Sequence, residues 1–148
     1  MHFQHTLVTG ATAERVFALV EDPRQRRRWQ AGLEETRYTS APQGDSPVGT
    51  RFIARIREGG RVQEYAGTLT EFERPRVLAM SLGNAHLSMH LRYALEPADS
   101  NTRLHVSGAL RGTTLLGRLA RFAFGWLTRR ILRRQLAQLK ALAETGTP

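Results

Sequence analysis

Three turns between strand-like segments constrain the fold of this chain more than any other feature of its sequence. Gly59-Gly60 and Gly83-Asn84 are typical of two-residue hairpin loops, and residues 97–102 form a longer loop. Each turn predicts which residues face each other across an antiparallel pair of strands. The predicted pairs are Glu58–Arg61, Ala54–Tyr65 and Ile56–Gln63 for the first turn, Met80–Leu87 and Leu78–Met89 for the second, and Glu96–Arg103, Leu95–Leu104 and Tyr93–Val106 for the third.

These pairings place the apolar residues of every hairpin on one face of a sheet. The strands are expected at residues 33–40, 49–58, 61–72, 76–83, 86–96 and 102–111. The apolar face carries Phe52, Ala54, Ile56, Tyr65, Leu69, Leu78, Met80, Leu87, Met89, Leu91, Tyr93, Leu95, Leu104, Val106 and Leu110. The opposite face carries Arg55, Glu64, Ser88, His90, Arg92, Arg103 and His105. We therefore expect an antiparallel meander with one dry face and one solvated face.

Two short helices are expected between a first strand, around residues 3–7, and the meander. Thr12 is a suitable N-cap for a helix whose apolar positions, 13, 16, 17 and 20, have helical spacing. Asp22 and Pro23 are typical of the cap and first position of a second helix, which must end before Gly32.

Residues 113–144 are expected to form the long helix that covers the dry face. At about 100° per residue, their apolar side chains fall into two clusters roughly 150° apart. The clusters are Leu115, Leu116, Leu119, Phe122, Ala123, Trp126 and Leu127, then Leu132, Leu136, Leu139 and Ala143. A straight helix cannot bury both against one sheet. Either the chain bends or breaks near Gly125, which we favour because glycine tolerates a bend, or the first cluster meets solvent, a partner subunit or a membrane.

Composition narrows the classes of site that the chain can hold. The chain has no cysteine, which excludes disulfides, thiol nucleophiles and cysteine-ligated metals. Its formal net charge of +9 favours anionic partners. The basic residues gather at Arg24, Arg26, Arg27 and Arg28, and at Arg118, Arg121, Arg129, Arg130, Arg133 and Arg134. These clusters are interpreted first as solvated faces, and otherwise as contacts for an anionic membrane or an acidic headgroup; the lack of interleaved aromatic residues argues against nucleic acid.

The order of elements, together with several short motifs, resembles the START-like (SRPBCC) superfamily, and within it bacterial polyketide cyclase/dehydrase and lipid-transport-type proteins. The motifs are residues 11–20 with Asp22, then Trp29, Val48-Gly49-Thr50, Gly67 to Pro75, and Leu136 to Glu144. The likeness spans nearly the whole chain, so residues 1–148 are expected to form a single domain. It implies an α+β helix-grip fold, in which a curved seven-stranded antiparallel sheet wraps around the long C-terminal helix.

The resemblance also implies a deep apolar cavity between sheet and helix that holds lipids, quinones, polyketides or similar molecules. Gly67 and Gly108 fall on the dry face, and we expect them to leave room for this cavity. The residues expected to line it and bind the ligand are Phe17, Trp29, Phe52, Ile56, Tyr65, Met80, Met89, Tyr93, Leu104, Val106 and Trp126. Gln63, Glu35 and Arg37 are further candidates for its polar groups, although the sequence leaves the faces of Glu35 and Arg37 open.

No pair of residues suits acid–base catalysis, and no catalytic residue is assigned. No cofactor or metal site is expected; His86 and His90, for example, are roughly 13 Å apart along one strand. The leading hypothesis is therefore a non-catalytic carrier or sensor of a hydrophobic small molecule. The alternatives are a polyketide cyclase or aromatase that uses the same cavity, and a basic module that associates with membranes or ribosomes. We expect a cytoplasmic protein, because no apolar run reaches the roughly 18 residues of a membrane span, and the oligomeric state is left open between monomer and dimer.

Overall fold

A computed structural model of the chain describes residues 2–40, 46–58, 60–98, 101–112 and 114–145. For residues 58 and 116–128 it describes the backbone but not the side chain. The elements in chain order are β1 (His2–Thr9), α1 (Ala13–Glu21), α2 (Pro23–Trp29), β2 (Leu33–Tyr38), β3 (Arg51–Glu58), β4 (Arg61–Glu73), β5 (Val77–Gly83), β6 (Leu87–Ala98), β7 (Asn101–Gly112) and α3 (Leu115–Glu144). The expected α+β order of elements is confirmed.

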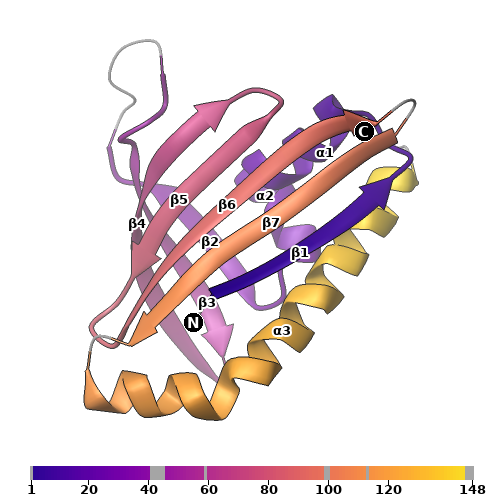
Figure 1. Ribbon diagram of the computed structural model, residues 1–148. Helices are drawn as coiled ribbons and strands as arrows, with labels where there is room; N and C mark the ends of the chain where they lie inside the picture. The colour runs from indigo at the N-terminus through magenta and orange to yellow at the C-terminus, as the bar shows by residue number, and fades with distance from the viewer. Residues whose placement is uncertain (1, 41–45, 59, 99–100, 113, 146–148) are drawn as a thin grey trace.

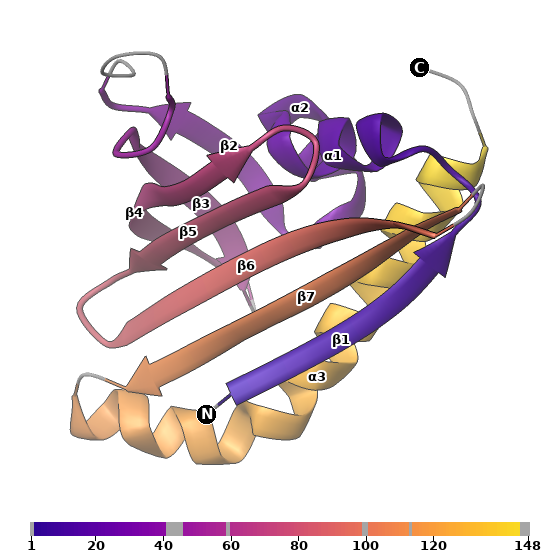
Figure 2. The same ribbon diagram turned by 45° about the horizontal axis from the view of Figure 1, so that its top comes forward.

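One curved antiparallel sheet holds the seven described strands in the order β1-β7-β6-β5-β4-β3-β2. Strands β2 to β7 form the predicted meander, and β1 pairs with β7 at one edge. Helix α3 runs along the inner side of that edge and contacts β7 and β1 (Figure 1). Helices α1 and α2 pack beside the C-terminal half of α3 and close one end of the curled sheet (Figure 2). This arrangement is the expected helix-grip fold.

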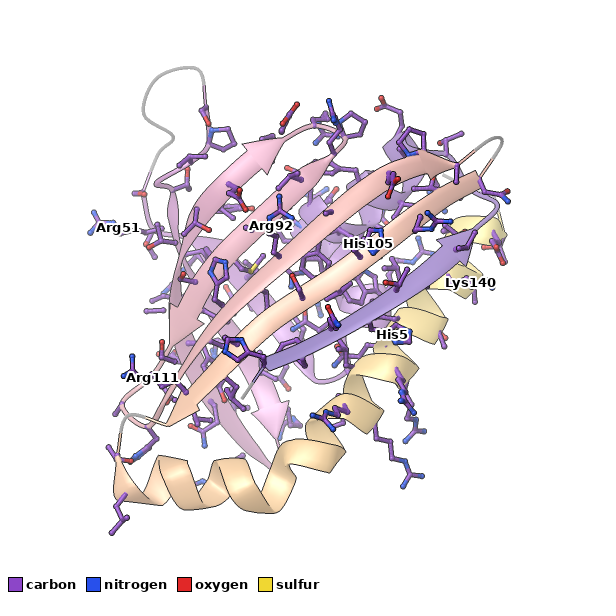
Figure 3. The ribbon with its side chains drawn as sticks, in the orientation of Figure 1. His5, Arg51, Arg92, His105, Arg111 and Lys140 are labelled. Atoms are coloured by element: carbon purple, nitrogen blue, oxygen red, sulfur yellow. The ribbon has the colours of Figure 1, made fainter. Side chains whose placement is uncertain are left out.

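Two of the three predicted hairpin registers are confirmed. Ala54 faces Tyr65 across the first turn, and Leu95 faces Leu104 across the third. The two faces of the sheet also separate as predicted. Figure 3 looks onto the outer face, where Arg92 and His105 lie on neighbouring strands. On that face the Nε of Arg92 lies 2.7 Å from a carboxylate oxygen of Glu71.

The predicted register of the second hairpin is wrong. Met80 faces Leu91 rather than Leu87, because the last pair before the turn is Gly83–Ser88, with four residues between them instead of two. The side-chain oxygen of Asn84 accepts hydrogen bonds from the backbone N–H groups of His86 and Leu87, both at 2.9 Å. These bonds stabilise a wider turn. The error is an even number of residues, so every side chain still lies on its predicted face.

Each of the two dry-face glycines lies under an aromatic ring of the neighbouring strand. Gly67 pairs with Phe52 and Gly108 pairs with Phe3, and in each case the phenyl ring of the partner covers the glycine. A Cβ atom at either position would overlap that ring. The two glycines therefore accommodate cross-strand aromatic rings, an arrangement that also fixes the register of the strands.

We expect Gly67→Val to lower the free energy of unfolding by about 1–3 kcal/mol, because the new side chain would compete with the Phe52 ring for one volume. The loss of unfolding free energy is expected to be smaller in a Phe52→Leu background, because the smaller leucine side chain leaves room for the valine. Urea unfolding of the single and double variants measures the coupling. Ala66→Val, on the exposed face of the same strand, is the control. Equal losses in both backgrounds would contradict the close approach.

The short helices begin where the sequence predicts. The Thr12 hydroxyl accepts a hydrogen bond from the Arg15 backbone N–H, and the Asp22 carboxylate accepts one from that of Arg24. The indole N–H of Trp29 then donates to the carbonyl oxygen of Leu19 at 2.8 Å. This buried bond ties the last turn of α2 to α1 and so fixes the orientation of α2 over the sheet.

The second apolar cluster of α3 is the one that packs against the sheet. Leu136, Leu139 and Ala143 are buried in the core, and Leu132 packs against it. Helix α3 is continuous from Leu115 to Glu144, so the chain does not break within it. Figure 1 shows that the axis of α3 changes direction partway along its length, as expected for a bend. Leu115 is exposed. The structure does not describe the side chains of the other members of the first cluster, at positions 116, 119, 122, 123, 126 and 127.

Candidate functional site

A cavity of about 310 Å³ lies between α2 and the inner faces of strands β2 to β6. It forms where α2 contacts β2 while α3 contacts β7 and β1 at the far edge of the sheet. Its apolar wall consists of Pro23, Leu33, Pro47, Phe52, Ala54, Ile56, Leu69, Phe72, Leu78, Met80, Leu82, Met89 and Leu91. Its polar wall consists of Glu21, Arg26, Gln30, Thr36, Tyr38, Ser40 and Thr50. The volume is at the lower end of the range typical of small-molecule sites, about 300–1,000 Å³.

Four residues proposed from the sequence as cavity lining belong to this wall: Phe52, Ile56, Met80 and Met89. Six others are buried in the packed core and do not contribute to the described wall: Phe17, Trp29, Tyr65, Tyr93, Leu104 and Val106. The side chain of Trp126 lies outside the described residues. The expectation that Tyr65 and Tyr93 touch the cavity is therefore wrong. Tyr93 is instead packed edge-on against Trp29, with ring centroids 6.3 Å apart.

Strand β2 contributes side chains that the sequence did not single out. A register shift between Leu33 and Glu35 turns Thr36 and Tyr38 toward the cavity and leaves Glu35 and Arg37 exposed. This settles the open orientation of Glu35 and Arg37, neither of which lines the cavity. The alternation within residues 36–38 was readable from the sequence, but the bulge that sets its phase was not.

Arg26 is the polar residue that departs most from expectation. The sequence predicts a solvated face for Arg26 and its three neighbouring arginines, and Arg24, Arg27 and Arg28 are exposed. Arg26 is only 8% exposed and lines the cavity. One terminal nitrogen of its guanidinium donates to the side-chain oxygen of Gln30 at 2.8 Å. The available sequence signal was the spacing of three residues from Trp29, which places both on one face of α2.

The Arg26 guanidinium also contacts two aromatic rings and a sulfur atom. Its central carbon lies 5.8 Å from the ring centroid of Trp29 and 5.9 Å from that of Tyr93. Its second terminal nitrogen lies 3.5 Å from the sulfur of Met80. The side chain is thus held in position by neutral neighbours.

Two further polar groups of the wall bear on its chemistry. The Thr50 hydroxyl is buried and has no hydrogen-bond partner among the described residues. The Tyr38 phenol has a pKa raised above its ordinary value, mainly by burial and further by the Glu21 carboxylate, while Arg26 opposes the shift. Tyr38 is therefore protonated at neutral pH, where it can donate a hydrogen bond but cannot serve as a base.

The carboxylate of the wall, Glu21, is paired with an arginine. One of its oxygens lies 2.8 Å from a terminal nitrogen of Arg74. Over the described ranges, no group of three histidine, aspartate or glutamate residues is placed to hold a metal ion. No helix, among the residues searched, is long and apolar enough to cross a membrane.

Comparison with known proteins identifies a family and several solved structures with a similar fold. The family model described as polyketide cyclase/dehydrase and lipid transport matches residues 1–144. An aromatase/cyclase named Zhui from Streptomyces sp. R1128 is similar in structure, with a TM-score of 0.78 and 15% identity over 97% of this chain and 93% of that one. A START superfamily protein from Mycobacterium smegmatis has a TM-score of 0.78 and 15% identity over 99% of both chains. A conserved protein from Geobacillus kaustophilus has a TM-score of 0.74 and 11% identity over 97% and 95%. No curated protein sequence matches this chain.

Proposed function

Since this chain belongs to the polyketide cyclase/dehydrase and lipid-transport family of START-like (SRPBCC) proteins, we propose that it binds a hydrophobic small molecule in the cavity beneath α2, without catalysing its conversion. The observation that carries the proposal is the cavity itself, whose wall is mainly aliphatic, aromatic and thioether side chains. An apolar ligand there would remove both its own surface and this wall from water.

The polar wall supports binding rather than turnover. General acid–base catalysis needs a group able to accept a proton near neutral pH. Tyr38 is protonated at that pH, and Glu21 is paired with Arg74. The described wall therefore presents donors that orient a ligand more readily than a base that activates one.

A cyclase or aromatase reaction is the second candidate function, and one observation favours it. Arg26 and Tyr38 present a cation and a phenol donor to the same cavity. Such donors stabilise the enolate that forms when a polyketide closes a ring. Turnover of a polyketide-like substrate that falls with Tyr38→Phe, while ligand affinity stays constant, would favour the enzyme over the carrier.

Filling the cavity tests whether it is the binding site. Ala54 lies on its wall, is 5% exposed and faces Thr36 and Tyr65 on neighbouring strands. We expect Ala54→Phe to weaken binding of the neutral fluorescent probe phenylnaphthylamine by at least about tenfold, which corresponds to about 1.4 kcal/mol.

The matched control is Ala66→Phe, which adds the same ring to the exposed side of strand β4. It is expected to bind the probe like the wild type. Circular dichroism verifies that both variants are folded. A folded Ala54→Phe variant with wild-type affinity would show that the probe binds elsewhere and would overturn the assignment of the site.

A further inference from the structure

A buried cation in a mainly apolar cavity restricts the chemistry of the ligand that can bind there. Arg26 is 8% exposed, and its side chain forms part of the cavity wall. An arginine side chain stays charged in a protein, so burial cannot be relieved by loss of a proton. A buried charge without a counter-ion is strongly disfavoured, and proteins rarely retain one.

Among the described residues, no carboxylate lies within ion-pair distance of the Arg26 guanidinium. The ion pairs of the described chain use Arg55, Arg57, Arg74, Arg76, Arg92 and His105. The hydrogen-bond partners of Arg26, the Gln30 amide and the Met80 sulfur, are neutral. Its Nε atom is buried and makes no hydrogen bond to a described residue.

The aromatic contacts hold the guanidinium in place without neutralising it. The rings of Trp29 and Tyr93 lie at almost equal distances from its central carbon. Attraction to a ring quadrupole is weaker than attraction to a full negative charge at similar burial. The position is therefore preorganised for an anion, which a flexible surface arginine would not be.

The rest of the wall restricts the charge and the polarity of the anion that can bind. Most of the described wall is apolar, and Thr50 adds one buried hydroxyl without a partner among the described residues. Arg26 is the one cation among the described wall residues, and Glu21 is already paired with Arg74, so a single positive charge is available and a doubly charged group is disfavoured. These features suit a single negative charge on an apolar body.

Resting on the function proposed above, we infer that the ligand is a compact hydrophobic acid whose carboxylate pairs with the Arg26 guanidinium. The apolar body then contacts the aliphatic and thioether wall that includes Ile56, Met80 and Met89. Both an aliphatic chain and a fused aromatic ring meet this description. The experiment therefore tests one acid of each kind against its neutral counterpart.

The first measurement uses the wild-type protein. Isothermal titration compares decanoate with decanol, and naphthoate with naphthol, at neutral pH and constant ionic strength. At least one acid is expected to bind about ten- to a hundredfold tighter than its alcohol, as for a hydrogen-bonded charge pair. The pair that shows the preference identifies a chain or a ring as the apolar body.

The second measurement tests whether Arg26 causes the preference for the acid. Arg26→Gln is expected to abolish the preference for the acid, so that each acid and its alcohol bind this variant with similar affinity. Arg26→Lys, which keeps the charge, is expected to retain part of the preference. The matched control is Arg27→Gln, which removes the same charge from an exposed position on the same helix and is expected to leave the preference intact.

The outcomes separate this inference from the proposed function. If acid and alcohol bind the wild type equally, the inference fails and the proposed function stands. If neither kind of probe binds, the proposed function fails, and the inference with it. If Arg27→Gln loses the preference as Arg26→Gln does, the effect comes from net charge and the assignment to Arg26 is overturned. If Arg26→Gln does not fold, the wild-type comparison and Arg26→Lys still decide the question.

Discussion

Replacing Phe17 by alanine is expected to lower the free energy of unfolding by about 3–5 kcal/mol. The Phe17 side chain is fully buried on the inner face of α1. Its ring meets the Phe72 ring edge-on at 5.5 Å, and the Arg74 guanidinium lies 4.9 Å from its centroid. The substitution removes these contacts and leaves a void that the surrounding helix and strands fill only in part.

The control for Phe17→Ala is Val8→Ala, because Val8 is 42% exposed on β1. That variant is expected to stay within about 0.5 kcal/mol of the wild type, as surface substitutions usually do. Chemical denaturation at neutral pH gives both values. A loss below about 1 kcal/mol for Phe17→Ala would contradict the burial of its ring against Phe72 and Arg74.

Leu136→Ala is expected to cost about 2–5 kcal/mol, the second large effect. Leu136 is fully buried in the core, in the part of α3 that packs on the sheet. Its neighbour in the same helix, Ile131, is 41% exposed and serves as the matched control. Ile131→Ala is expected to change stability by less than about 1 kcal/mol. Similar losses for the two variants would mean that α3 does not present the cluster of Leu132, Leu136 and Leu139 to the sheet.

The sheet was largely predictable because hairpins are local. Turn residues at Gly59-Gly60 and an alternating pattern are sufficient to pair Ala54 with Tyr65. The hairpin after Gly83 was not predictable in the same way, because the Asn84 side chain accepts two backbone hydrogen bonds and widens the loop. Side-chain capping of a turn competes with the shorter loop, and the pattern of the strands does not distinguish them.

The cavity was harder to predict, because it depends on how elements distant in sequence fit together. Sequence periodicity identifies an inward residue but not whether its neighbours leave space beside it. Met80 and Tyr93 are both inward, yet Met80 lines the cavity while Tyr93 is covered by Trp29 and Arg26. The glycines illustrate the same limit, since the pattern places Gly67 on the dry face but does not show that the Phe52 ring covers it.

Arg26 shows that charge alone does not predict whether a side chain is exposed. In a run of four arginines within five residues, the ordinary expectation is a solvated surface. The helical turn places Arg26 on the face of Trp29, and the tertiary fold then buries it. The Arg26 side chain is therefore buried by the position of α2 over the sheet, which local sequence does not specify.

Methionine methyl NMR can show whether the cavity binds an apolar molecule. The chain has three methionines, Met1, Met80 and Met89, and the last two line the cavity. Protein labelled at the methionine methyl groups is titrated with phenylnaphthylamine, and Met80→Leu and Met89→Leu variants assign the signals. We expect the Met80 and Met89 signals both to shift and to saturate together at one probe per chain. Saturable binding of the probe with both signals unchanged, or no binding at all, would contradict this expectation.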